Sequence, residues 1–94
     1  MKLQFEWSQA KADSNWRRHG VSFRAGTTVF KDPFAIELLD DREDYGEQRF
    51  VILGMAEAQT LLFAAYTERE DRIRIISARR TTPDEEQDYF LQNT

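Results

Sequence analysis

The sequence predicts an α+β domain in which one mostly antiparallel sheet packs against two helices that precede it and one that follows it. Three observations support this fold class. Four strand-like segments follow one another directly, helical patterns flank them on both sides, and 94 residues suffice for one domain with a modest core. The expected order of elements, over a single domain covering residues 1–94, is β-α-α-β-β-β-β-α.

A short strand and a helix open the chain. Residues 2–7 alternate between apolar and polar side chains, which is typical of a strand. Ser8 then supplies an N-cap for a helix over residues 9–19, and Gly20 supplies its C-cap. The last turn of this helix is basic and suits the negative end of the helix dipole. Its basic residues are Arg17, Arg18 and His19.

The first helix is expected to place Ala12 and Trp16 on its apolar face. Ser22 can cap a second helix, in which apolar residues recur at helical spacing. The Asp-Pro pair at 32–33 is expected to end that helix, because the residue before a proline is pushed out of the helical conformation.

Alternation predicts the next two strands, at residues 34–39 and 48–54. Between them, residues 40–46 form an acidic segment that is expected to be an exposed loop, and residues 55–59 are a weakly marked connection. Near the end of the chain, Thr82 caps a final helix that begins with proline and carries acids in its first turn.

The segment between these elements is predicted to be a hairpin. Residues 61–66 form a nearly continuous apolar run, which indicates a strand covered on both faces. Residues 68–71 are too polar to bury, so we expect the turn there, and residues 72–80 form the last strand. Five arginines lie within twelve residues of this hairpin: Arg69, Arg72, Arg74, Arg79 and Arg80.

Two interpretations of these arginines are open. Alternation puts Arg72 and Arg74 on one face of the last strand, and guanidinium groups on a rigid sheet could grip phosphate with paired donors. The more common interpretation of such a pattern is structural, because strand arginines usually pair with carboxylates. The nearest candidate partners in sequence are Glu68, Glu70 and Asp71.

Charge is distributed unevenly along the chain, whose formal net charge is −4. Residues 1–24 carry five basic and two acidic side chains, and residues 63–80 carry five and three. Residues 40–47 carry one basic and five acidic side chains, and residues 81–94 carry four acids and no base. If the two basic segments meet in space, a local positive surface survives the negative total.

Composition excludes several kinds of site. The sequence has no cysteine, so disulfides and thiolate metal sites cannot form, and His19 is the single histidine. The four glycines are isolated, which argues against a phosphate-binding loop, and the acidic segment lacks the calcium-loop spacing. We therefore expect no metal and no cofactor. The chain shows no apolar run of signal-peptide or membrane-spanning length, so the cytoplasm is the expected location.

Several segments together resemble the BrnT family of bacterial toxins. They are FEWSQAKADSNWRRHGVSF at residues 5–23, VFKDP at 29–33, the pair Glu47 and Arg49, AYTERE at 65–70 and RIRIISARR at 72–80. They cover nearly the whole chain in matching order. The resemblance implies a RelE-like fold, an endoribonuclease that cleaves RNA (messenger RNA in the first place), and neutralisation by an antitoxin similar to BrnA. Operator DNA would be reached only through that antitoxin.

A mechanism without metal can be set beside this resemblance. The 2′-hydroxyl of RNA attacks the adjacent phosphorus, and the enzyme orients it, neutralises the phosphoryl oxygens and moves two protons. The candidates for phosphate stabilisation are Arg69, Arg74 and Arg79, and the candidates for proton transfer are Glu68, Tyr66 and His19. Further RNA contacts are expected from Arg17, Arg18, Arg72 and Arg80. The alternative is a catalytically inactive member that serves as antitoxin partner and co-repressor of its own operon.

The chain departs from the family pattern at three places. Ser8 stands where the family often has aspartate, and Arg24 and Ala25 stand where it often has acidic residues. The last helix, commonly basic in the family, is acidic here through Asp84, Glu85, Glu86 and Asp88. We expect these acids to weaken RNA binding, because phosphate contacts dominate affinity for nucleic acid.

Overall fold

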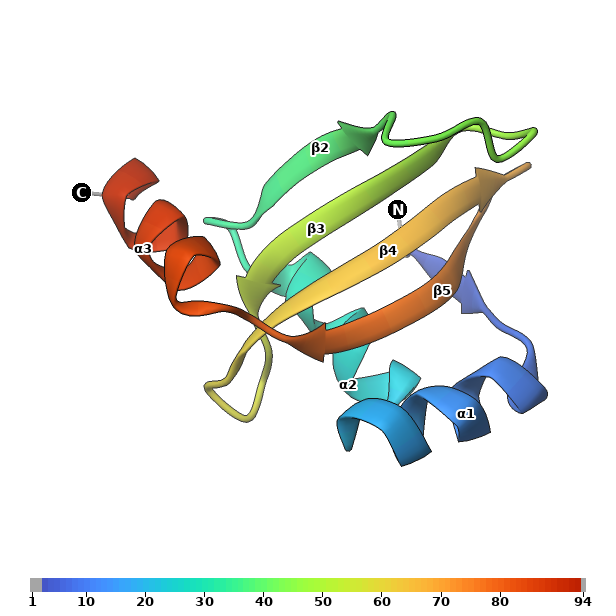
Figure 1. Cartoon of the computed structure of the whole chain (residues 1–94), viewed down its shortest axis with the longest axis horizontal. Helices are drawn as coiled ribbons and strands as arrows, with labels where there is room; N and C mark the ends of the chain where they lie inside the picture. The colour runs from blue at the N-terminus through green and yellow to red at the C-terminus, as the bar shows by residue number, and fades with distance from the viewer. Residues whose placement is uncertain (1–2, 94) are drawn as a thin grey trace.

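The computed structural model describes residues 3–93, and within that range the strands form one five-stranded sheet of order β1-β5-β4-β3-β2 (Figure 1). The elements are β1 (Gln4–Glu6), α1 (Gln9–His19), α2 (Phe23–Thr28), the 3-10 turn η1 (Val29–Lys31), β2 (Ile36–Asp40), β3 (Arg49–Met55), β4 (Leu61–Arg69), β5 (Arg72–Arg80) and α3 (Pro83–Gln92). The strand β1 is parallel to β5, and the other pairs are antiparallel. The predicted fold class and element order are confirmed.

One face of the sheet carries the main core. Phe23 and Val29, from α2 and η1, are buried against Ile52, Ala64 and Ile75 of the three central strands. We call this side the helix-covered face. On the opposite side, Tyr89 of α3 packs on Leu53 and Leu61 near one end of the sheet. Figure 1 shows α3 at one end of the sheet, so a helix covers only that end of this second side, which we call the open face.

A register shift in β5 decides which side chains reach each face. Ala65 of β4 pairs with Ser77, whereas Tyr66 pairs with Ile75, so Ile76 is one extra residue in β5. As a result Ile75 and Ala78, three positions apart, are both buried in the same core. Such a bulge reverses the alternation of faces beyond it.

The helix α1 lies along β5 (Figure 1). Within the described residues, β1 pairs only with residues 72–74 of β5, and the buried side chain of Asn15 forms hydrogen bonds with the edge farther along. Its amide group donates to Ala78 O at 2.7 Å and to Val21 O at 2.9 Å, and it accepts from Ala78 N at 3.1 Å. Asn15 thus substitutes for a neighbouring strand at Ala78 and fixes α1 to the sheet.

Helix caps follow the sequence prediction closely. Ser8 accepts from Lys11 N, Ser22 accepts from Ala25 N, and Thr82 forms a capping box with Glu85. Gly20 ends α1 with φ at 65°, a left-handed conformation that glycine adopts without strain.

Some predicted boundaries and one predicted face were wrong. The strand β4 continues through Arg69, so the turn is limited to two residues, Glu70 and Asp71, with Glu70 at φ 57°. Cross-strand pairing of Glu68 with Ile73 explains why the polar segment remains extended. The side chain of Trp16 is 59% exposed, because the inward position of that turn is taken by Asn15.

Smaller shifts affect the other elements. The first strand covers Gln4–Glu6 instead of 2–7, and residue 2 of that prediction lies outside the described residues. The second strand begins at Ile36 instead of residue 34, and the second helix tightens into η1 before Asp32. These shifts leave the topology unchanged.

The acidic loop after β2 is organised around Asp40, which is buried. Arg42 donates to it through Nε at 2.8 Å and Nη2 at 2.9 Å, and the Tyr45 hydroxyl donates at 3.2 Å. The hydrogen bond from Arg42 is the main cause that lowers the pKa of Asp40 to about 2. Neither carboxylate oxygen is left for a divalent ion, so the loop is a closed ion-pair turn with exposed acids around it.

We predict that Asn15→Ala lowers the free energy of unfolding by about 2 to 4 kcal/mol, because the backbone groups of Ala78 and Val21 lose their buried partner. Urea unfolding measures this loss. Ser14→Ala is the matched control on the preceding residue, which is only partly buried and forms no side-chain hydrogen bond within residues 3–93, and it should change stability by less than about 0.5 kcal/mol. Equal effects of the two substitutions would show that the Asn15 contacts do not hold α1.

We predict that Asp40→Asn flattens the acid dependence of stability. A carboxyl group with a lowered pKa stabilises the folded chain above its unfolded value of 3.8, and this contribution is lost as the pH falls toward about 2. Urea unfolding at several pH values between about 5 and 2 should therefore show a smaller decline in Asp40→Asn. The control Asp41→Asn, on the exposed neighbour, should keep the wild-type slope; an unchanged slope in Asp40→Asn would contradict the assignment.

Candidate nucleic-acid interface and active site

A small groove between α1 and β5 brings predicted site residues together. Its volume is about 190 Å³, and its lining residues are Lys11, Ser14, Asn15, Arg18, His19, Ile76 and Ser77. The α1 residues recur every three or four positions, which places them on one side of the helix. On the strand side, the bulge at Ile76 turns Ser77 toward the open face, opposite Ala65. The last turn of α1, with Arg18 and His19, therefore faces Ile76 and Ser77 of β5 across the groove.

The groove is positively charged. None of its lining residues is acidic, and within residues 3–93 neither Lys11 nor Arg18 takes part in an ion pair. Among nearby acids on α1, Asp13 accepts a hydrogen bond from Gln9 instead. Two unpaired cations and an imidazole thus line a concave surface, a set that can bind a phosphodiester and move a proton.

Lys11 is the groove residue that sequence reasoning missed as a site residue. It lies seven positions before Arg18 and eight before His19. That spacing corresponds to two helical turns, so the three side chains share one side of α1. The helical spacing of basic residues was the signal that could have found it.

The open face carries the strand arginines that were predicted to bind phosphate. Arg74 pairs opposite Thr67, and Arg79 pairs opposite Phe63, four positions away on the same face of β4. Arg69 follows Thr67 by two positions and so lies on that face as well. Without the extra residue at Ile76, Arg79 would project from the other side of the sheet. The structure therefore places Arg69, Arg74 and Arg79 on one face.

Each of these arginines is held by a carboxylate. Arg74 contacts Glu6 at 2.7 Å, Arg79 contacts Glu85 at 2.8 Å, and Arg69 contacts Glu47 at 3.5 Å. The candidate partners predicted from sequence proximity were wrong, because the acids that form these pairs come from β1, from the segment before β3 and from α3. The structural interpretation is thus confirmed in that these arginines pair with carboxylates, but the predicted carboxylates were the wrong ones.

The remaining arginines of the prediction are spread over the surface. Arg72 is 4.0 Å from Glu6, and Arg49 contacts Glu47 at 3.3 Å and lies over the ring of Tyr45. Arg17 is exposed on α1 outside the groove lining, and Arg80 lines a different hollow beside α3. Of the predicted RNA contacts, only Arg18 lies in the groove.

Tyr66 and Glu68 lie away from the groove. Tyr66 is buried on the helix-covered face between the rings of Phe30 and Phe50, and its hydroxyl donates to Glu37. Burial, followed by the hydrogen bond to Glu37, raises the pKa of the Tyr66 hydroxyl far above its usual value. Tyr66 and Glu68 line a separate hollow, whose other charged residues are Glu37, Glu70, Asp71 and Arg72. With four carboxylates and one arginine these surroundings disfavour phosphate, and none of Arg69, Arg74 and Arg79 lines this hollow.

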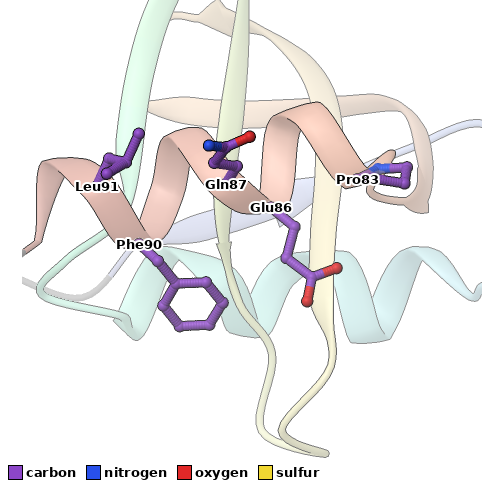
Figure 2. Close-up of a pocket in the computed structure, with 5 residues that line it drawn as sticks. All are labelled: Pro83, Glu86, Gln87, Phe90 and Leu91. Carbon is purple, nitrogen blue, oxygen red and sulfur yellow. The ribbon is translucent and has the colours of Figure 1, made fainter.

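A hollow along α3 differs in character. Figure 2 shows its lining residues, which run along one side of the helix: Pro83, Glu86, Gln87, Phe90 and Leu91. They include no basic side chain and no residue of the predicted site. This surface lacks the groups needed to bind phosphate.

The described part of the chain shows neither a cluster of metal ligands nor a helix that could span a membrane. Within residues 3–93, no group of three or more histidine, aspartate or glutamate side chains is arranged to hold a metal ion. No helix in the described part of the chain combines the length and the apolar character needed to span a membrane.

Comparisons with known proteins agree with the architecture. The crystal structure of the Brucella abortus ribonuclease toxin BrnT is similar, with a TM-score of 0.67 and 14% sequence identity, over 86% of this chain and 99% of that chain. At this identity the likeness shows the shared fold, while a search of curated proteins found no match. Residues 7–85 match the family described as "Ribonuclease toxin, BrnT, of type II toxin-antitoxin system". Because this match spans most of the sequence, the chain belongs to the BrnT family of ribonuclease toxins, whose type II systems pair a toxin with an antitoxin.

Proposed function

We propose that the chain is an endoribonuclease that cleaves RNA, messenger RNA in the first place, in the groove between α1 and β5, and so inhibits translation and growth. The observation that carries this proposal is that His19 and two cations without an ion pair in residues 3–93, Lys11 and Arg18, line one groove beside the arginine-bearing face. Membership of a ribonuclease toxin family supports the same reaction class. The site of action would be the cytoplasm, where messenger RNA is translated.

The chemistry needs no metal. The 2′-hydroxyl loses its proton and attacks the adjacent phosphorus, which forms a 2′,3′-cyclic phosphate. The 5′-oxygen of the next nucleotide leaves and takes up a proton, so that atoms and charge balance. His19 is the group suited to these proton transfers near neutral pH, because imidazole both accepts and donates protons there.

Charge on the phosphoryl group is neutralised by the surrounding cations. Lys11 and Arg18 project from α1 into the groove, and they can hold the non-bridging oxygens as charge develops. Arg79 and Arg74 project from the neighbouring open face of β5 and can hold the phosphates on either side. Fixed donors that need no reorganisation supply the larger part of catalysis in such sites.

The second candidate function is a catalytically weak member that acts as antitoxin partner and co-repressor. It is favoured by one observation, namely that each arginine of the open face is already neutralised by a carboxylate. The two candidates differ in whether the groove, which has unpaired cations, suffices for cleavage.

We predict that the purified chain, freed of antitoxin, cleaves RNA equally well with and without excess EDTA. The products should carry 2′,3′-cyclic phosphate and 5′-hydroxyl ends. His19→Ala, purified in the same way, should lose at least about 100-fold in rate, as is typical when a general acid–base group is removed. A strict requirement for magnesium, or equal cleavage by His19→Ala, would refute the mechanism.

We predict that a small antitoxin similar to BrnA, which alone of the two proteins contacts operator DNA, covers the groove. Co-expression with the product of the adjacent gene should give a stable complex without ribonuclease activity. The complex should bind operator DNA, whereas the isolated chain should not. A complex that cleaves RNA as fast as the free chain would show that the antitoxin leaves the groove open.

A further inference from the structure

The side chain of Arg79 is held more completely than any other predicted phosphate ligand. Its guanidinium carbon lies 4.2 Å from the centre of the Phe63 ring, which supports it from the sheet side. Nη1 donates to Glu85 Oε1 at 2.9 Å and to Arg80 O at 3.0 Å, and Nη2 donates to Glu85 Oε2 at 2.8 Å. These contacts fix both the position of the guanidinium plane and its rotation.

Two N–H groups of Arg79 remain available to a ligand. A guanidinium group has five N–H bonds, and three of those on Arg79 are used by Glu85 and Arg80. The other two, on Nε and on Nη2, point to the same side and have no partner within residues 3–93. Two parallel N–H groups of this kind match two oxygens of a phosphate. The side chain of Arg79 is 32% exposed, so this edge can be reached.

Glu85 is itself fixed in place. Its Oε1 accepts from Thr82 N at 2.9 Å, while Glu85 N donates to the Thr82 hydroxyl at 3.2 Å, which closes the capping box at the start of α3. The hydrogen bond from Arg79 is the main cause that lowers the pKa of the Glu85 carboxyl, so Glu85 is ionised at neutral pH. The start of α3 thus anchors the arginine through a rigid, charged intermediate.

We propose that Glu85 is a positioning residue, which holds Arg79 so that its free Nε–Nη2 edge faces the phosphate of a bound RNA. This inference rests on the proposed ribonuclease function. Glu85 has two opposing effects. It orients the donors before the substrate arrives, which favours the transition state, and it cancels one positive charge, which weakens binding of the ground state. Glu85 of α3 therefore lowers the affinity for RNA and improves the orientation of Arg79.

The matched pair of variants is Glu85→Gln and Glu86→Gln. Both remove one negative charge from the same turn of α3, but Glu86 is exposed and has no ion pair within residues 3–93. Glutamine can retain the capping box, so α3 should remain folded in both variants. Thermal unfolding of each variant confirms this before the kinetics are compared.

We expect a split between kcat and KM. Glu85→Gln should lower kcat by about 10-fold or more, because the freed guanidinium loses its orientation, while KM stays equal or falls. Glu86→Gln should keep the wild-type kcat. Equal kcat values in the two variants, or a rise of kcat in Glu85→Gln, would overturn the positioning role and show that Glu85 only competes with RNA for Arg79.

A spectroscopic measurement separates this inference from the ribonuclease proposal. In NMR spectra of the arginine side chains, restricted rotation should give resolved Nη signals for Arg79 in the wild type and averaged signals in Glu85→Gln. Titration of the wild type with inorganic phosphate should shift the Arg79 Nε–H signal in a saturable way. Averaged wild-type signals, or no shift with phosphate, refute the positioning role even if the chain cleaves RNA. An inactive wild type with the expected spectra refutes the ribonuclease proposal alone.

Discussion

One extra residue in β5 determines how the rest of this structure is arranged. Because Ile76 is inserted between the pairs Tyr66–Ile75 and Ala65–Ser77, the strand changes which side chains face the core. Ile75 and Ala78 both reach the helix-covered face, and the core stays continuous across the bulge. The same change turns Ser77 and Arg79 toward the open face, where they join Arg74. A bulge beside a proposed active site is a common device for directing side chains.

The bulge also explains where α1 lies. Beyond residue 74, no strand formed by residues 3–93 lies on the outer side of β5, and the backbone groups at Ala78 need a partner. Asn15 supplies both a donor and an acceptor there, so α1 lies along the edge with its basic side chains beside β5. The buried amide of Asn15 thus holds α1 beside β5 and so forms the groove. Lys11 and Arg18 of the same helix give the groove its positive charge. In this chain the stability of the fold and the geometry of the proposed site depend on the same contacts.

The distribution of charge reconciles a net charge of −4 with an RNA substrate. The strand arginines are neutralised by Glu6, Glu47 and Glu85. Most exposed acids lie on α3, in the loop after β2 and around the turn between β4 and β5, and none of the exposed acids lines the groove. Lys11 and Arg18, which form no ion pair in the described part of the chain, lie in the groove on α1. Local field, and not net charge, decides where an anionic ligand binds when opposite charges are kept apart.

The sequence predicted the fold class, the order of elements and the helix caps, because these depend on local patterns such as alternation, Ser8, Gly20 and Thr82. The bulge at Ile76 was not predicted, although the alternation changes phase there, because the adjacent apolar residues Ile75 and Ile76 are also compatible with a regular strand that is covered on both faces. The carboxylates that bind the arginines were assigned by sequence proximity, whereas Glu6 and Arg74 are 68 residues apart in the chain and are brought together by the pairing of β1 with β5. Tyr66 looked suited to proton transfer, but its burial beside Glu37 is a tertiary effect that no local pattern reveals.

We propose above all that RNA binds in the groove between α1 and β5. It is tested most directly by the affinity for a 2′-O-methyl RNA, which cannot be cleaved, in Arg18→Gln and Arg24→Gln. Each variant removes one exposed cation that has no ion pair within residues 3–93, but only Arg18 lines the groove. We expect Arg18→Gln to weaken binding several-fold and to reduce its salt dependence by about one counterion, with Arg24→Gln close to wild type. Equal losses in both variants, or none in Arg18→Gln, would place the RNA elsewhere.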